Sequence, residues 1–148
     1  MGTIASLGDT MSGKRRILVA AQPSAQTVLK VMLGDLANLS AARTTADAFE
    51  ILERERIDLI ICTVAFDESR MTEFLATVKR TTSTKHIPFL CARAVPGIIR
   101  DSLVSTIRDG CKAIGAADLV DIAKLSPEQA KAAMRAAVRR VLPQDPDV

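Results

Sequence analysis

The chain has 148 residues, of which 48% are hydrophobic and 25% are charged, a balance typical of one globular domain. No apolar run approaches the roughly 20 residues needed to cross a bilayer, and the N-terminus lacks the apolar core of a signal peptide, so we expect a cytoplasmic protein without membrane insertion. The net charge of +3 is too small to indicate a nucleic-acid partner, and a chain without Trp or Tyr is poorly suited to stacking bases.

Segments typical of strands alternate with segments typical of helices along the whole chain. The expected strands cover residues 15–23, 38–43, 57–63, 86–94 and 116–122. The expected helices cover residues 24–36, 44–56, 69–80, 97–114 and 126–142. Residues 14–142 are therefore predicted to form one domain between flexible tails at 1–13 and 143–148.

Apolar residues recur at helical spacing and predict which side of each helix faces the core. The inward residues expected in the first helix are Val28, Val31, Met32 and Leu36. Those expected in the third helix are Met71, Phe74, Leu75 and Val78. Those expected in the fourth helix are Ile99, Leu103, Ile107, Cys111 and Ile114. Thr44 or Thr45 and, further on, Ser126 are expected to cap helices at their N-termini.

Five strand–helix units at this spacing predict an α/β fold with a parallel sheet covered by helices on both faces. Right-handed crossovers make such a sheet doubly wound. With five strands we expect the flavodoxin-like strand order 2-1-3-4-5. The continuous apolar run of residues 57–63 suits a strand that is buried on both faces.

The three cysteines, Cys62, Cys91 and Cys111, are widely spaced, and His86 is the only histidine. A zinc site needs clustered ligands, so no metal or other cofactor is expected. We interpret the cysteines as small buried hydrophobic residues. The alternative is a redox switch, which would require Cys62 and Cys91 to face each other on neighbouring strands.

The order of these segments resembles the receiver domains of bacterial two-component response regulators, over about residues 14–142. The stretches that carry the likeness are "RRILVAAQPS", "IDLIICTVAFDESRMTEFL", "HIPFLCARA", "GAADLV" and "SPEQAKAAMRAAVRRVL". They occur in the family's order and at workable spacing. The resemblance implies the flavodoxin-like fold and a role in signal transduction.

The resemblance also marks where this sequence departs from the family. Receiver domains bind magnesium through two acidic residues after the first strand and a phospho-accepting aspartate after the third. Here the acidic pair falls on Ala20 and Ala21, and the acceptor falls on Thr63. Magnesium demands hard oxygen ligands, and these three side chains offer at most one weak oxygen.

Two further positions differ from the family pattern. The Ser or Thr that ends the fourth strand falls on Arg93, and the lysine after the fifth strand falls on Ile122. A slip in the alignment would instead place Asp121 or Lys124 at the lysine position. Without metal and lysine, nothing neutralises the charge on a transferring phosphoryl group. We therefore expect no enzymatic phosphotransfer and a stand-alone pseudo-receiver, a degenerate receiver that binds a signalling partner without phosphorylation.

Arg93 is expected near Thr63 at the carboxyl ends of the strands, where ligands bind in this fold. Three alternatives are open for its side chain. It could pair with Asp67 or Glu68 and lock the domain in one state, or bind an anionic ligand such as a nucleotide phosphate. It could also simply point to solvent.

The last expected helix carries four basic residues and one acidic residue. Lys131, Arg135 and Arg139 recur every four residues, and Arg140 lies beside them, so they form one basic stripe. The stripe could be a solvated surface, or it could dock an acidic protein partner or a second copy of the chain. Nucleic acid is the least favoured partner, because no recognition-helix motif accompanies the stripe.

Overall fold

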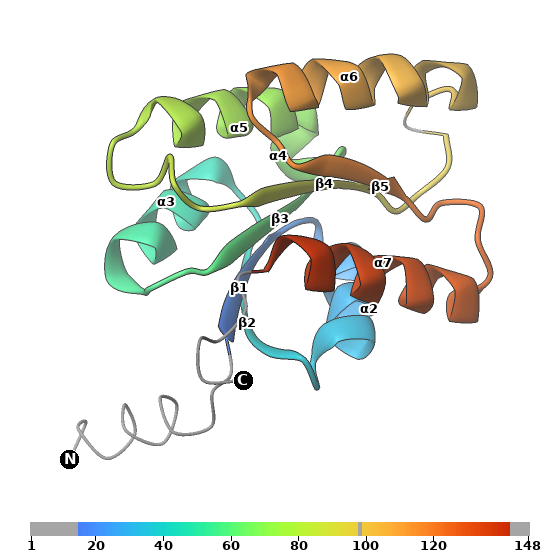
Figure 1. Cartoon of the computed structure of the whole chain (residues 1–148), viewed down its shortest axis with the longest axis horizontal. Coiled ribbons are helices and arrows are strands. Elements are labelled where there is room, and N and C mark those ends of the chain that lie inside the picture. The colour runs from blue at the N-terminus through green and yellow to red at the C-terminus, as the bar shows by residue number, and fades with distance from the viewer. Residues whose placement is uncertain (1–14, 98, 143–148) are drawn as a thin grey trace.

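The computed structural model describes residues 15–97 and 99–142. Its strands are β1 (Arg15–Ala20), β2 (Ala37–Ala42), β3 (Leu59–Thr63), β4 (Phe89–Arg93) and β5 (Asp118–Asp121). They form one parallel sheet in the order β2-β1-β3-β4-β5, which confirms the predicted topology (Figure 1). The tails predicted at 1–13 and 143–148 lie outside the described residues.

The helical segments are α2 (Pro23–Leu33), α3 (Thr45–Arg54), α4 (Phe66–Ser69), α5 (Met71–Arg80), η1 (Asp101–Leu103), α6 (Val104–Ile114) and α7 (Pro127–Val141). Helices α2 and α7 lie side by side on one face of the sheet, and α3, α5 and α6 cover the other (Figure 1). None of the helices in the described ranges is long and apolar enough to span a bilayer.

The sheet separates two hydrophobic clusters, because successive strand residues point to opposite faces. Leu18, Ile60 and Phe89 pack under α3, α5 and α6, whereas Ile17 and Ile61 pack under α2 and α7. All five residues of β3 are buried, as expected for its continuous apolar run. The rigid sheet fixes the positions of the strand ends.

The predicted N-caps are confirmed at two helices. Thr44 Oγ1 accepts a hydrogen bond from the backbone N–H of Asp47 at the start of α3. Ser126 and Gln129 form a reciprocal capping box at the start of α7, with Pro127 in the first helical position. These local signals define where the helices begin.

The predicted inward face of α2 is partly wrong. Val28 and Val31 are 43% and 74% exposed, whereas Ala25, Leu29 and Leu33 are buried against the sheet. The buried residues also recur at helical spacing, but the first of them is Ala25, whose small side chain gives a weak hydrophobic signal. Because α2 has apolar residues on more than one side, the spacing alone did not distinguish the two faces.

The fourth predicted helix begins later than expected. Residues 97, 99 and 100 are not helical, η1 starts at Asp101, and Leu103 and Ile114 are 46% and 38% exposed. The reason lies in a tertiary contact, because the carbonyl of Ile99 accepts a hydrogen bond from Arg93 Nη2 at 3.0 Å. This contact holds the segment before η1 against the end of β4.

Candidate functional site

The carboxyl ends of β1, β3 and β4 meet at one edge of the sheet. In the strand register Ala20 lies opposite Cys62 on β3, and Thr63 lies opposite Ala92 on β4. This edge is where doubly wound folds bind their ligands. The residues that follow the strands therefore define the candidate site.

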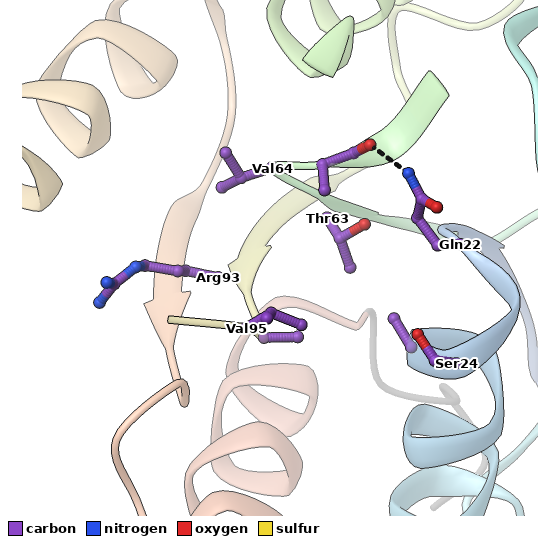
Figure 2. Close-up of a pocket in the computed structure, with 9 residues that line it drawn as sticks. Gln22, Ser24, Thr63, Val64, Arg93 and Val95 are labelled. Carbon is purple, nitrogen blue, oxygen red and sulfur yellow. Dashed lines mark hydrogen bonds between the residues drawn. The ribbon is translucent and has the colours of Figure 1, made fainter. Parts of the chain in front are cut away.

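A cavity of about 220 Å³ lies at this edge, between the end of the sheet and the start of α2 (Figure 2). Its wall is formed by Gln22, Ser24, Ala25, Thr63, Val64, Ala65, Arg93, Ala94 and Val95. Most of these side chains are apolar. Ala20 and Ala21 do not line the cavity, because both are fully buried in the two hydrophobic clusters.

Thr63 is one of two buried polar side chains that line this cavity, the other being Arg93. Thr63 is only 3% exposed, and its Oγ1 has no hydrogen-bond partner within the described ranges 15–97 and 99–142. In Figure 2 its hydroxyl oxygen lies on the side that faces Gln22 and the start of α2. Leaving a buried hydroxyl without a partner costs about 1–3 kcal/mol.

Replacing Thr63 with valine is expected to raise the free energy of unfolding by about 1 kcal/mol, since the shape is retained and an unpaired hydroxyl is removed. Urea denaturation measures the change. Thr84→Val is the matched control, because the buried Thr84 hydroxyl donates to the Val78 carbonyl at 2.8 Å and its loss should be destabilising. Equal destabilisation by both valines would contradict this description of Thr63.

The N-terminus of α2 forms the opposite wall. Gln22 is the N-cap residue, but its side chain does not cap the helix and instead donates from Nε2 to the Ala65 carbonyl at 2.8 Å (Figure 2). Pro23 occupies the first helical position and has no N–H. The N–H groups of Ser24 and Ala25, both of which line the cavity, thus belong to an uncapped first turn.

Arg93 belongs to an ion-pair cluster, which we call the Arg93 cluster: Arg93, Asp101, Asp121 and Lys124. Arg93 is its buried member, whereas Asp121 is half-buried and Asp101 and Lys124 are largely exposed. Arg93 is 2% exposed; its Nη2 lies 2.7 Å from Asp101 Oδ1 and its Nη1 lies 3.1 Å from Asp121 Oδ2. Lys124 pairs with the second oxygen of Asp101. The hydrogen bonds from Lys124 and Arg93 hold the pKa of Asp101 below its usual range. The cluster joins the end of β4 to η1 and to the end of β5.

The orientation of Arg93 corrects two expectations. Its side chain does not point to solvent, and it does not pair with Asp67 or Glu68. Its terminal nitrogens are directed away from Thr63 and Gln22 and are engaged by Asp101 and Asp121, whereas its Nε has no hydrogen-bond partner among the described residues (Figure 2). Sequence reasoning missed Asp101 as a partner, because that residue falls within a segment of helical periodicity.

The position expected for the family's lysine holds a core residue. Ile122 is 5% exposed and packs in the cluster beneath α7, so it does not line the cavity. The two alternative positions, Asp121 and Lys124, both belong to the Arg93 cluster. Lys124 forms an ion pair with Asp101 and does not line the cavity.

The side chains at this edge do not fit magnesium. The cavity wall contains no carboxylate, and Thr63 Oγ1 is the single side-chain oxygen at the three positions that bind the metal in receiver domains. Within the described ranges no group of three or more His, Cys, Asp or Glu side chains could hold a metal ion.

Asp67 has a structural contact after β3. Its carboxylate accepts hydrogen bonds from the N–H and the Oγ1 of Thr45, each at 2.8 Å, and these lower its pKa. The contact ties the β3–α5 loop to the first turn of α3. It also holds Asp67, Glu68 and Ser69 at φ values of 46°, 57° and 66°, which non-glycine residues rarely adopt.

Stability is expected to fall at acid pH. Hydrogen bonds from Arg135, Thr45 and Lys124 hold the pKa values of Asp35, Asp67 and Asp101, respectively, below their usual range. The folded state therefore binds fewer protons than the unfolded state, in which the Asp pKa is about 3.9.

The stabilisation from these carboxylates is complete above about pH 5 and is lost as the pH falls through the folded pKa values. Urea denaturation at pH 6 and pH 3 should show the difference, and Asp67→Asn should make it smaller. An equal free energy of unfolding at both pH values would contradict the assignment.

The basic stripe of α7 is divided in two by the structure. Lys131, Arg139 and Arg140 are exposed, as expected of a docking surface. Arg135 is instead 18% exposed in its side chain and binds Asp35 through both terminal nitrogens, at 2.6 and 3.2 Å. Its Nη1 also donates to the carbonyl of Met32, so Arg135 anchors α7 to the end of α2.

The three cysteines are free and fully buried, as interpreted from the sequence. Cys62 and Cys91 are direct partners in the register of β3 and β4, the geometry that the redox alternative required. Burial raises the pKa of the Cys62 thiol well above its ordinary value, which leaves little reactive thiolate. A redox role stays an untested prediction.

Comparisons with solved structures bear on the fold. No protein-family model matches the chain, and no curated protein matches it. The chemotaxis response regulator CheY4 of Vibrio cholerae is 21% identical over 87% of this chain and 98% of that chain, with a TM-score of 0.65. A response regulator from Hahella chejuensis is 19% identical over 85% and 93%, with a TM-score of 0.68.

A third similar structure is the receiver domain of the sensor histidine kinase PA1611 from Pseudomonas aeruginosa, solved with magnesium in its active-site cleft. It is 18% identical over 86% of this chain and 97% of that chain, with a TM-score of 0.65. The chain has the receiver-domain fold. The likeness covers nearly all of the receiver structures, so the cavity and the Arg93 cluster lie in a receiver fold at the carboxyl end of its sheet.

Proposed function

We propose that this chain is a pseudo-receiver, a cytoplasmic, non-enzymatic module of bacterial signal transduction that binds a protein partner without being phosphorylated. The observation that carries the proposal is the Arg93 cluster. Its ion pairs connect the ends of β4 and β5 to the segment that leads into α6, and they form between side chains of this chain without a phosphoryl group.

The buried charge of Arg93 favours the geometry that keeps its partners in place, because a charge that loses its partners in the interior is costly. Arg93 contacts two carboxylates and one carbonyl, so two separate segments, residues 99–101 and the end of β5, are fixed to a single guanidinium. One arrangement of η1, α6 and β5 is therefore favoured without a phosphoryl group. The side chains of Ala20, Ala21 and Thr63 also lack the carboxylates with which receiver domains bind magnesium and accept a phosphoryl group.

The docking surface in this proposal is the exposed part of α7, namely Lys131, Arg139 and Arg140. Three cations within three turns attract an acidic surface, and helix faces are common docking elements. Arg135 is left out, because its charge is already neutralised by Asp35. The partner is proposed to be an acidic surface of another signalling protein; a second copy of this chain is the alternative outcome.

The test compares two triple variants with the same change in charge. Lys131→Glu/Arg139→Glu/Arg140→Glu alters the proposed surface, and Arg43→Glu/Arg56→Glu/Lys85→Glu alters three exposed cations elsewhere. We expect wild type and the second variant to capture the same protein from lysate, and the first variant to lose it, with or without prior treatment by acetyl phosphate and magnesium. Capture that requires the phosphodonor, or that survives the α7 changes, would contradict the proposal.

The second candidate, an anion sensor that uses Arg93, is not favoured by the geometry. The terminal nitrogens of Arg93 are engaged by Asp101, Asp121 and the Ile99 carbonyl, on the side away from the cavity. A sensor at this edge would have to hold its ligand with groups other than these terminal nitrogens.

A further inference from the structure

The cavity at the carboxyl edge of the sheet presents donors on two walls and no carboxylate. One wall has the buried Thr63 hydroxyl, which lacks a partner within the described ranges. The facing wall has the uncapped first turn of α2 with the Ser24 hydroxyl. Groups from β3 and α2 thus converge on one space (Figure 2).

The electrostatics of this space favour a single negative charge. The 11 residues of α2 give its N-terminus a partial positive charge, and its first-turn N–H groups seek acceptors. Thr63 can donate one further hydrogen bond. A phosphate dianion would fit poorly, because the terminal nitrogens of Arg93 are already paired with Asp101 and Asp121 and most of the wall is apolar.

The apolar part of the wall indicates the chemistry of the uncharged part of the ligand. Ala25, Val64, Ala94 and Val95 surround the space next to the donors. A volume of about 220 Å³ corresponds to about seven water-sized groups at roughly 30 Å³ each. A carboxylate with a short aliphatic body matches this combination of donors, shape and size.

We propose that this cavity binds a short-chain aliphatic monocarboxylate, whose carboxylate accepts from Thr63 Oγ1 and from the first turn of α2. The branched body lies against the valine and alanine side chains. This inference goes beyond partner binding by α7 and does not depend on it, since no residue is shared between the two sites.

The test is a titration of ¹⁵N-labelled protein with isovalerate, followed by amide chemical shifts. We expect saturable shifts at Ser24, Ala25, Thr63 and Ala65, with a dissociation constant on the order of 1–10 mM for so small a ligand. The neutral isostere isovaleramide should bind at least about fivefold more weakly, and inorganic phosphate should give no saturable shifts at these residues.

Two variants separate binding from folding. Thr63→Val should weaken isovalerate binding about tenfold, because a hydrogen bond to a charged group is lost. Ser24→Asp places a carboxylate in the first turn of α2, where it supports the helix but repels the ligand, so saturable binding should disappear in a folded protein.

The proposal is overturned if isovalerate gives no saturable shifts at 50 mM, about five times the upper end of the expected range of dissociation constants. It is overturned equally if phosphate or the amide binds as well as isovalerate, or if Ser24→Asp binds unchanged. Such failures would leave capture of a partner by α7 unaffected, so the two proposals can fail separately.

Discussion

Replacing Arg93 with alanine is expected to lower the melting temperature by roughly 10 °C. The change leaves a void in a site that is 98% buried and leaves Asp121 without its cation, while Asp101 retains only Lys124. Both effects are among the few mechanisms that give large losses of stability. Thermal unfolding followed by circular dichroism measures the shift.

Two comparisons make this result specific. Arg56→Ala removes a cation whose side chain is 90% exposed, so its melting temperature should change by less than about 1 °C. Arg93→Met/Asp121→Asn removes the charge pair together while keeping the volume, and it should recover roughly half of the loss. If Arg93→Ala and Arg56→Ala have the same small effect, the Arg93 cluster does not hold the strand ends.

Local opening should accompany the loss of stability. Amide hydrogen exchange in Arg93→Ala is expected to rise in η1 and at the end of β5, the two segments that the guanidinium holds. The α2–α7 side of the domain should change little. This pattern would show that the cluster fixes one arrangement of the edge, rather than merely filling space.

Arg135→Glu is expected to lower the melting temperature by roughly 5 °C. The substitution breaks the two contacts to Asp35, loses the hydrogen bond to the Met32 carbonyl and brings two carboxylates together. Arg139→Glu on the same helix is the matched control. Its side chain is exposed, so its melting temperature should stay within about 1 °C of wild type.

A charge swap tests whether the contact itself is responsible. Asp35→Arg/Arg135→Glu restores opposite charges at the two positions and should regain part of the stability. A loss of partner capture by Arg135→Glu would then reflect the displaced helix and not a missing contact with the partner. The account of Arg135 would be contradicted if the charge swap recovered no stability and if Arg135→Glu and Arg139→Glu lowered the melting temperature equally. Arg135 would then belong with the exposed basic residues of α7.

Local and nearest-neighbour signals predicted most of the fold. The apolar run of β3, the caps at Thr44 and Ser126 and the inward residues of α5 are confirmed. Each depends on residues within a few positions of one another. The alternation of strands and helices then left few possible topologies.

The candidate site was less predictable, because its contacts connect distant parts of the chain. Arg93 reaches residues 8 and 28 positions away, and Arg135 reaches Asp35 across 100 positions. A basic residue at a strand end is normally expected to be exposed. That Thr63 has no partner among the residues that the structure describes is likewise visible only once the neighbouring strand ends and α2 are in place.

The most direct measurement treats the protein with acetyl phosphate and magnesium and records its intact mass and its amide chemical shifts, with a magnesium-binding receiver domain as the positive control. We expect an unmodified mass and unchanged shifts at the Arg93 cluster, because no carboxylate lines the cavity and the edge is already held by Arg93. A phosphorylated species accompanied by shifts in η1, α6 or β5 would contradict a pseudo-receiver that works without phosphorylation.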